Sequence, residues 1–129
     1  MSQVSVEVRA MAEALNSGDL EAFLARTAED VEFTSLVAEA EGRTFRGHPG
    51  VRAWWETVLG AFQDPRWEVL DVRGSGDRAV VKSRLTATLA DTKVEQTMWM
   101  AARLREAKLG WWAFFRTERE ALEAAGLRE

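Results

Sequence analysis

The 129-residue chain contains no cysteine, no tyrosine and a single histidine. The lack of cysteine excludes disulfide bonds, thiolate metal sites and a cysteine nucleophile. The lack of tyrosine excludes every mechanism that needs a phenol as acid or hydrogen-bond donor. One histidine and no cysteine do not make up the ligand set of common transition-metal sites, so we expect neither a metal ion nor a cofactor.

Long apolar runs and blocks of one charge are also absent. No stretch reaches the roughly 20 apolar residues needed to cross a bilayer, and the start, MSQVSVEVRAMAEAL, has glutamates where a signal peptide is apolar. The net charge is −4, and the chain has no basic cluster of the kind that binds nucleic acid. We expect one cytoplasmic domain covering residues 1–129, with no membrane or nucleic-acid partner.

Aromatic residues are concentrated in tryptophan, of which there are six. The segment FRGHPGVRAWWE, residues 45–56, places Trp54 and Trp55 shortly after the only histidine, His48. Proline is preferred at the first position of a helix, so Pro49 predicts a helix start with His48 at or near its N-cap. Two interpretations stay open: a core helix with a capping histidine, or a pocket wall with an acid or base at its rim.

Apolar residues at helical spacing predict the remaining helices. One covers residues 4–15, and a short second helix begins after Asp19 as N-cap. The helix that begins at Pro49 continues to Phe62 by the spacing of its apolar residues. The last helix opens with the capping box TERE, residues 117–120, and ends at Gly126.

Alternating patterns predict strands, and the short connections between the later ones indicate antiparallel pairing. The expected strands are 31–36, a short one near 44–45, 67–72, 78–89, 94–105 and 109–116. Residues 27–30 and 64–65 are expected to break the preceding helices. Helices first and a meander later predict an α+β domain with the helices on one face of a curved antiparallel sheet.

Alternation within these strands separates two faces of the sheet. The face toward the helices combines small residues such as Ser83 and Ala87 with large aromatic residues such as Trp112. Such a set either fills the core or leaves an apolar cavity, the usual character of a small-molecule site. The opposite face carries Trp99, Trp111 and Phe115, an apolar patch typical of interfaces. We therefore expect a homodimer through this outer sheet face.

Three segments resemble a known family: ALNSGDLEAFLARTAEDVEF, GRTFRGHPGVRAWWE and, near the end, EALEAAGL. They are similar to the SnoaL-like branch of the nuclear transport factor 2-like superfamily. That branch contains polyketide cyclases, ketosteroid isomerase relatives and many bacterial proteins. The resemblance implies a cone-shaped α+β barrel with a deep apolar cavity between curved sheet and helices, commonly dimeric.

The same resemblance places the catalytic positions of ketosteroid isomerase on this chain. The tyrosine falls at Met11, the general-base aspartate at Ser35, and the protonated aspartate at Met100 or, one residue earlier, at Trp99. None of these residues keeps the chemistry, so we expect no ketosteroid isomerisation by that route. Divergence and engineering of the pocket would both produce these losses, and the sequence does not distinguish them.

The functional hypothesis is that the chain binds an apolar, cyclic small molecule in the helix–sheet cavity. No Asp or Glu is expected on the inward faces. If the protein is a cyclase, isomerase or hydrolase, the candidate base is His48 or a carboxylate from outside those faces. The alternative is a non-enzymatic dimerisation domain with a filled core. The expected ligand-binding residues are Met11, Ser35, Trp54, Trp55, Ser83, Leu85, Gln96, Met98, Met100, Trp112, Phe114 and Arg116.

Overall fold

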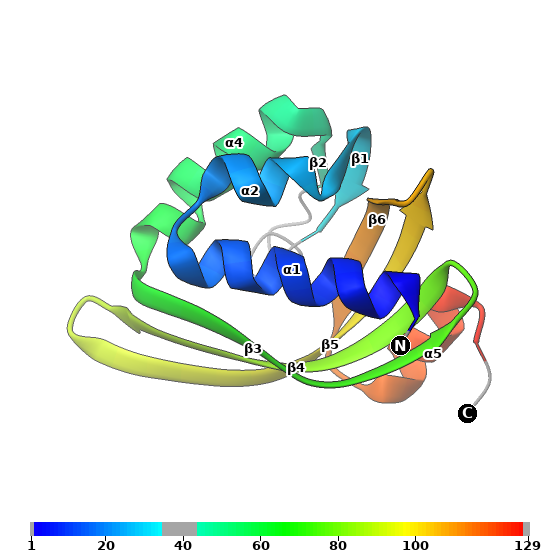
Figure 1. Ribbon diagram of the computed structural model, residues 1–129. Coiled ribbons are helices and arrows are strands. Elements are labelled where there is room, and N and C mark those ends of the chain that lie inside the picture. Colours follow the sequence, from blue (N-terminus) through cyan, green and yellow to red (C-terminus); the bar gives the residue numbers. More distant parts are fainter. Residues whose placement is uncertain (1, 35–43, 128–129) are drawn as a thin grey trace.

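A computed structural model of the protein describes residues 2–34 and 44–127 and confirms the α+β architecture (Figure 1). Its helices are α1 (Gln3–Ser17), α2 (Leu20–Ala25), α4 (Gly47–Thr57), the 3-10 turn η1 (Leu59–Ala61) and α5 (Glu118–Ala125). Its strands are β1 (Thr27–Phe33), β2 (Phe45–Arg46), β3 (Gln63–Ser75), β4 (Arg78–Leu89), β5 (Thr92–Arg105) and β6 (Lys108–Phe115). The described strands form one six-stranded sheet in the order β2-β1-β6-β5-β4-β3.

The sheet is curved, and β2 and β3 form its two edges. The pair β1–β6 is parallel, whereas the other neighbours pair antiparallel. β4 pairs with β5 from Arg78–Arg103 to Leu89–Thr92, but β6 pairs with β5 only from Trp99 onward. The far end of the β3–β4–β5 layer therefore extends past β6, and this extension carries the pocket described below.

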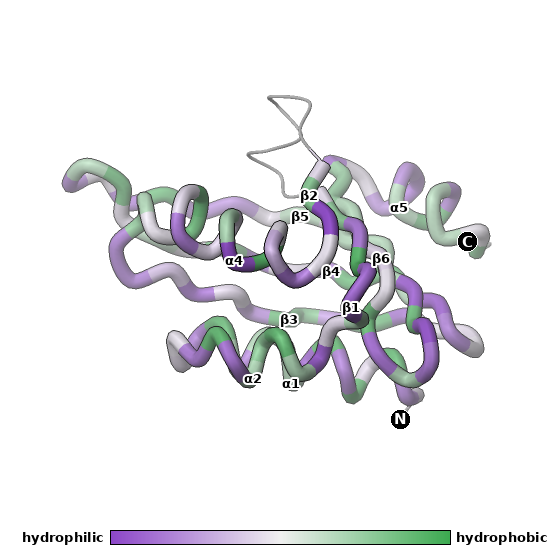
Figure 2. The backbone as a smooth tube through the Cα atoms, turned by 90° about the horizontal axis from the view of Figure 1, so that it is seen from above, coloured by the Kyte–Doolittle hydropathy of each residue, from purple (hydrophilic) through white to green (hydrophobic). Residues whose placement is uncertain are grey.

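Helices α1, α2 and α4 cover the concave face of the sheet (Figure 1). Along α1 hydrophobic and hydrophilic residues alternate with the helical turn (Figure 2). Its buried face includes Val4, Val8, Met11 and Leu15, the spacing that the sequence predicted. These residues join the main core, which also contains Phe23 and Trp112.

Helix α5 lies on the opposite, outer face of the sheet, where the sequence predicted no helix (Figure 1). Its buried residues Ala121, Leu122 and Ala125 form a second core cluster with Val80 and Ala101. The aromatic side chains of the outer face pack against this cluster and are only partly exposed. The prediction that all helices share one face was wrong because an eight-residue helix gives too few apolar positions to assign its partner.

The first strand begins four residues earlier than predicted, so the expected break at residues 27–30 was wrong. Thr27 already pairs with Leu109 of β6, and the backbone N–H of Leu109 donates to the carbonyl of Arg26 at 2.9 Å. Glu29 and Asp30 are exposed, so their charge does not oppose a strand there. The predicted end of this strand at residue 36 lies outside the described residues.

Both prolines lie inside elements rather than at their boundaries. Pro49 is the third residue of α4, where its missing N–H removes no helical hydrogen bond. Pro65 lies in β3, which begins at residue 63 rather than 67. Proline is tolerated there because β3 is an edge strand and its register shifts between Gln63 and Arg66. The helix predicted to reach Phe62 ends at Thr57 and continues as η1.

Candidate functional site

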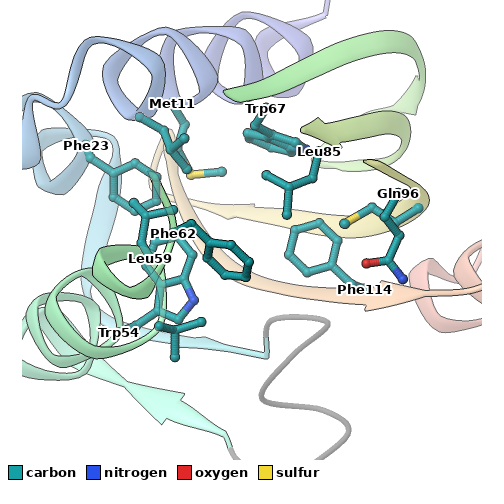
Figure 3. Close-up of a pocket in the computed structure, with 12 residues that line it drawn as sticks. Met11, Phe23, Trp54, Leu59, Phe62, Trp67, Leu85, Gln96 and Phe114 are labelled. Carbon is teal, nitrogen blue, oxygen red and sulfur yellow. The ribbon is translucent and has the colours of Figure 1, made fainter. Parts of the chain in front are cut away.

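An apolar pocket lies between the extended β3–β4–β5 layer and the helices above it (Figure 3). Its cavity volume is about 70 Å³, several times the roughly 10–15 Å³ that one water molecule needs on the same measure. It therefore has room for a compact ring system. The described residues that line it are Met11, Leu15, Phe23, Trp54, Val58, Leu59, Phe62, Trp67, Leu85, Gln96, Met98 and Phe114.

The floor of the pocket is set by strand register. Trp67 pairs with Leu85 across β3–β4, and Leu85 pairs with Gln96 across β4–β5. Residues directly opposite each other point to the same face of a sheet, so these side chains form one row on the concave side. Met98 comes from the next inward position of β5, and Phe114 from β6, where its ring meets that of Trp67 edge-on at 6.3 Å.

The roof of the pocket comes from four helical segments. Trp54 of α4 stacks on Phe23 of α2 with a centroid distance of 5.8 Å, which fixes the plane of its indole. Leu59 of η1 and Phe62 directly after it reach the pocket because the chain leaves the α-helix at Thr57. Met11 contributes from the buried face of α1, so the roof is almost entirely apolar.

Trp67 is held in place through its backbone by Asn16, near the end of α1. The Asn16 Nδ2 donates to the carbonyl of Trp67 at 3.0 Å, and the Trp67 N–H donates to Asn16 Oδ1 at 2.7 Å. This two-point contact supplies edge strand β3 with the partner that a further strand would have given. The helix end therefore fixes where the Trp67 indole enters the pocket.

Two polar atoms in the pocket wall lack a partner. Trp54 and Trp67 are 8% and 4% exposed, and the Nε1 of each is buried without a hydrogen-bond partner among the residues that the structure describes. Leaving a buried donor unsatisfied costs about 1–3 kcal/mol. The two nitrogens are covered by neighbouring protein atoms, so the two indoles contribute the apolar surface of their rings to the pocket wall.

The structure places six of the predicted ligand-binding residues in the wall of this one pocket. They are Met11, Trp54, Leu85, Gln96, Met98 and Phe114. Gln96 is exposed and lies at the rim, so its amide is the polar side chain at the opening.

Five other predicted residues lie outside the lining. Three of them are buried in the core, with exposures of 0%, 0% and 2%: Ser83, Met100 and Trp112. Trp55 is half-buried beside α2. Arg116 is exposed after the end of β6. The Ser83 hydroxyl donates to the carbonyl of Met98 at 3.3 Å rather than to the pocket. The predicted Ser35 lies outside the described residues.

His48 does not line the pocket and contacts the first residue of β1 instead. Its Nε2 is 3.1 Å from both the carbonyl oxygen and the Oγ1 of Thr27. The Thr27 hydroxyl donates its only proton to the carbonyl of Leu24 at 2.9 Å. Both oxygens are therefore acceptors toward His48, whose Nε2–H must donate. This contact joins the start of α4 to β1.

Six lining residues were missing from the sequence-based site: Leu15, Phe23, Val58, Leu59, Phe62 and Trp67. Leu15 and Phe23 lie at apolar positions of the two predicted N-terminal helices, and that signal could have placed them in the site. Trp67 needed the β3–β4 register, which the alternation of β4 alone does not give. Leu59 and Phe62 needed the end of α4 at Thr57, which no capping residue marks.

The lining has no ionisable side chain among the described residues. Likewise, no group of three or more His, Asp or Glu within the described ranges 2–34 and 44–127 could hold a metal ion. In the same ranges no helix is long and apolar enough to span a bilayer. The pocket can thus exclude water, stack on rings and donate hydrogen bonds, and its described walls supply no proton-transfer group.

The family of the chain follows from its sequence match. A model of the SnoaL-like domain matches residues 8–120. The chain belongs to the SnoaL-like domain family. This match covers most of the chain and confirms the resemblance seen in the sequence. No functionally curated protein matches this SnoaL-like chain in sequence.

Solved structures similar to this SnoaL-like protein confirm the fold. An NTF2-like protein of unknown function from Burkholderia pseudomallei shares 23% identity at a TM-score of 0.79, over 97% of this chain and 98% of that one. A Catenulispora acidiphila protein with a ketosteroid isomerase-like fold, in complex with trimethylamine, shares 17% identity at 0.76, over 95% and 93%. A Mycobacterium tuberculosis protein in complex with estradiol-17beta-hemisuccinate shares 16% identity at 0.78, over 92% and 97%.

Proposed function

We propose that this SnoaL-like protein binds a compact, mostly apolar, cyclic small molecule in the pocket between α4, η1 and the β3–β4–β5 layer. The observation that carries this proposal is an apolar cavity of about 70 Å³ with five aromatic side chains in its wall. Apolar concave sites with a few placed polar groups are the usual form of small-molecule sites.

Rings from several elements support a cyclic ligand. Phe23, Trp54, Phe62, Trp67 and Phe114 all reach the pocket. Aromatic side chains bind flat rings well because their faces and edges both make favourable contacts. Similar folds hold cyclic molecules, such as the estradiol ester bound by the Mycobacterium tuberculosis protein.

The proposal does not assign a reaction. The described lining offers no carboxylate, imidazole or amine, and general acid–base catalysis needs such a group within hydrogen-bond reach of the substrate. His48 is held against Thr27. We propose a binding protein, and the detection of cyclase, isomerase or hydrolase turnover that Leu85→Phe abolishes would contradict it.

The experiment is a titration with indane, a rigid bicyclic hydrocarbon, followed by tryptophan fluorescence and thermal unfolding. Ligand at ten times Kd should stabilise the fold by about 1.4 kcal/mol and so raise Tm by roughly 4–8 °C. Leu85→Phe fills the pocket and should abolish both responses. Leu89→Phe, on the same strand but 42% exposed and outside the lining, is the matched control and should keep them.

A second candidate function is that of an association domain, acting through the outer sheet face. Trp99, Trp111 and Phe115 remain partly exposed there beside α5, and the Trp99 Nε1 is buried without a partner among the described residues. We propose a homodimer through this face, with Trp99→Lys expected to give a folded monomer. Light scattering that finds wild-type monomers at tens of micromolar would contradict the dimer and leave the ligand proposal standing.

A further inference from the structure

We propose that the ligand site extends past the apolar pocket into an open groove beside the ends of α1 and α4, and that the ligand is a ring compound with a chain that ends in an amine. The ring lies in the pocket and the chain in the groove. The inference rests on the proposed function and adds to it a second subsite and the chemical class of its occupant.

The groove shares a wall with the pocket. Leu15, Leu59 and Phe62 line both the pocket and the groove, so a single layer of side chains separates the two. On the other side of this layer the groove is lined by the half-buried residues Trp55 and Pro65, neither of which lines the pocket. A ring and a chain attached to it can therefore occupy neighbouring spaces, with Phe62 at their junction.

The dividing layer belongs to a weakly bonded segment. Leu59 and Phe62 come from η1 and the residue after it. The N–H of Ala61 donates to the Val58 carbonyl at 3.3 Å, and the N–H of Phe62 donates to the Leu59 carbonyl at 3.1 Å. Such 3-10 hydrogen bonds have poorer geometry than those of an α-helix, and Gly60 within the turn adds backbone freedom. The two side chains can thus move apart to admit a chain.

The polar side chains of the groove are mainly hydrogen-bond acceptors. Glu56 and Asp64 are exposed carboxylates, which accept and do not donate. The Ser17 hydroxyl uses its one proton on a carbonyl of α1 at 2.8 Å, and the Asn16 amide is bonded at both ends to Trp67. No Lys, Arg or His lines the groove among the described residues. A chain end that donates therefore matches the groove.

An ammonium group matches it best because the same surroundings favour positive charge. Both carboxylates attract a cation, and an alkylammonium ion within about 6 Å of an indole face, such as that of Trp55, is attracted to the ring. Helices α1 and α4 end at Ser17 and Thr57, and neither has a basic residue in its last turn. The partial negative charge at these helix ends adds to the attraction and opposes an anionic chain end.

The first test compares 4-phenylbutylamine with 4-phenylbutanoate, which have similar length and opposite charge. By calorimetry the amine should bind roughly 3- to 10-fold more tightly than the carboxylate. The double variant Glu56→Gln/Asp64→Asn should reduce this difference to less than about 2-fold and leave indane affinity unchanged. Asp71→Asn/Asp91→Asn removes the same charge from two exposed residues outside the pocket and the groove, so it should keep the difference.

The second test locates the chain. Nuclear Overhauser contacts should join the methylene next to the amine to the Trp55 ring, and the phenyl protons to Phe114. Gly60→Leu places a side chain in the groove, and its Cβ meets only the Trp55 carbonyl oxygen at 3.4 Å, so the fold is kept. This variant should weaken amine binding at least about 3-fold and leave indane unaffected. Ala61→Leu, exposed and outside both linings, is the control.

The outcomes separate the two proposals. Equal affinities of the amine and the carboxylate, or an amine affinity that Gly60→Leu leaves unchanged, would overturn the groove inference. If indane still binds the wild-type protein in that case, the apolar pocket and the proposed function stand. If indane too fails to bind at millimolar concentration, the proposed function fails together with the inference.

Discussion

The side-chain amide of Asn16 is bonded at both ends to the backbone of Trp67, with distances of 3.0 and 2.7 Å. The contact joins α1 to β3 across 51 positions of sequence. It matters for the pocket because the Trp67 ring lines the cavity beside Phe114. A residue at a helix end thereby positions a side chain of the pocket wall.

Asn16→Ala should destabilise the protein by about 1–3 kcal/mol, because it leaves the N–H and carbonyl of Trp67 without their partner. Urea unfolding measures this change, and the same variant should weaken indane binding. Ser17→Ala removes a hydroxyl that bonds only to the Glu13 carbonyl on the exposed side of the same helix end, so it should change stability by less than about 0.5 kcal/mol. Equal stabilities of the two variants would contradict the positioning role of Asn16.

His48→Ala should cost about 0.5–1.5 kcal/mol of stability, because the Nε2–H donates to Thr27 in a half-buried site. His48→Gln places an amide donor in a similar position and should recover part of this loss. Binding of indane should be unchanged in both variants. If instead His48→Ala weakens binding tenfold without loss of stability, the histidine belongs to the site and our placement of it is wrong.

Leu122→Ala should cost about 2–5 kcal/mol, since Leu122 is 2% exposed in the cluster between α5 and the outer sheet face. Glu123→Ala, the exposed neighbour that pairs with Arg119 at 3.4 Å, should cost less than about 0.5 kcal/mol. Thermal unfolding distinguishes the two. A small effect of Leu122→Ala would mean that α5 does not hold the outer aromatic residues.

The capping box at the start of α5 gives a further prediction. The Thr117 hydroxyl oxygen accepts from the Glu120 N–H at 3.2 Å. Thr117→Ala should lower stability by about 1 kcal/mol, and Thr117→Ser should restore it, because serine keeps the capping oxygen. Circular dichroism melts of the three proteins check this order, and an alanine variant as stable as wild type would contradict it.

The sequence predicted the elements whose signals are local. Val4 to Leu15 repeat at helical spacing, Asp19 and Thr117 carry the caps seen in the structure, and β4 has the bounds expected from its alternation. Of the strand residues that alternation predicted for the pocket, half line the cavity: Leu85, Gln96, Met98 and Phe114. These features depend on neighbours in the chain, which a sequence displays directly.

The remainder depends on contacts between distant segments. Trp67 lies opposite Leu85 because the register of β3 against β4 shifts between Val69 and Asp71. Met100 and Trp112 point to the same face of the sheet as the pocket residues, but they lie where β6 and β1 close the core. Alternation along a strand tells which face a side chain points to. Whether that side chain lies in the core or in the cavity depends on its position along the strand, which the sequence alone does not specify.

The most direct measurement is a crystal structure of the protein grown with indane. The account predicts density for the bicyclic ring between Phe114 and the rings of Trp54 and Trp67. Density for the ligand on the outer face alone, or a pocket closed by its own side chains, would contradict the account.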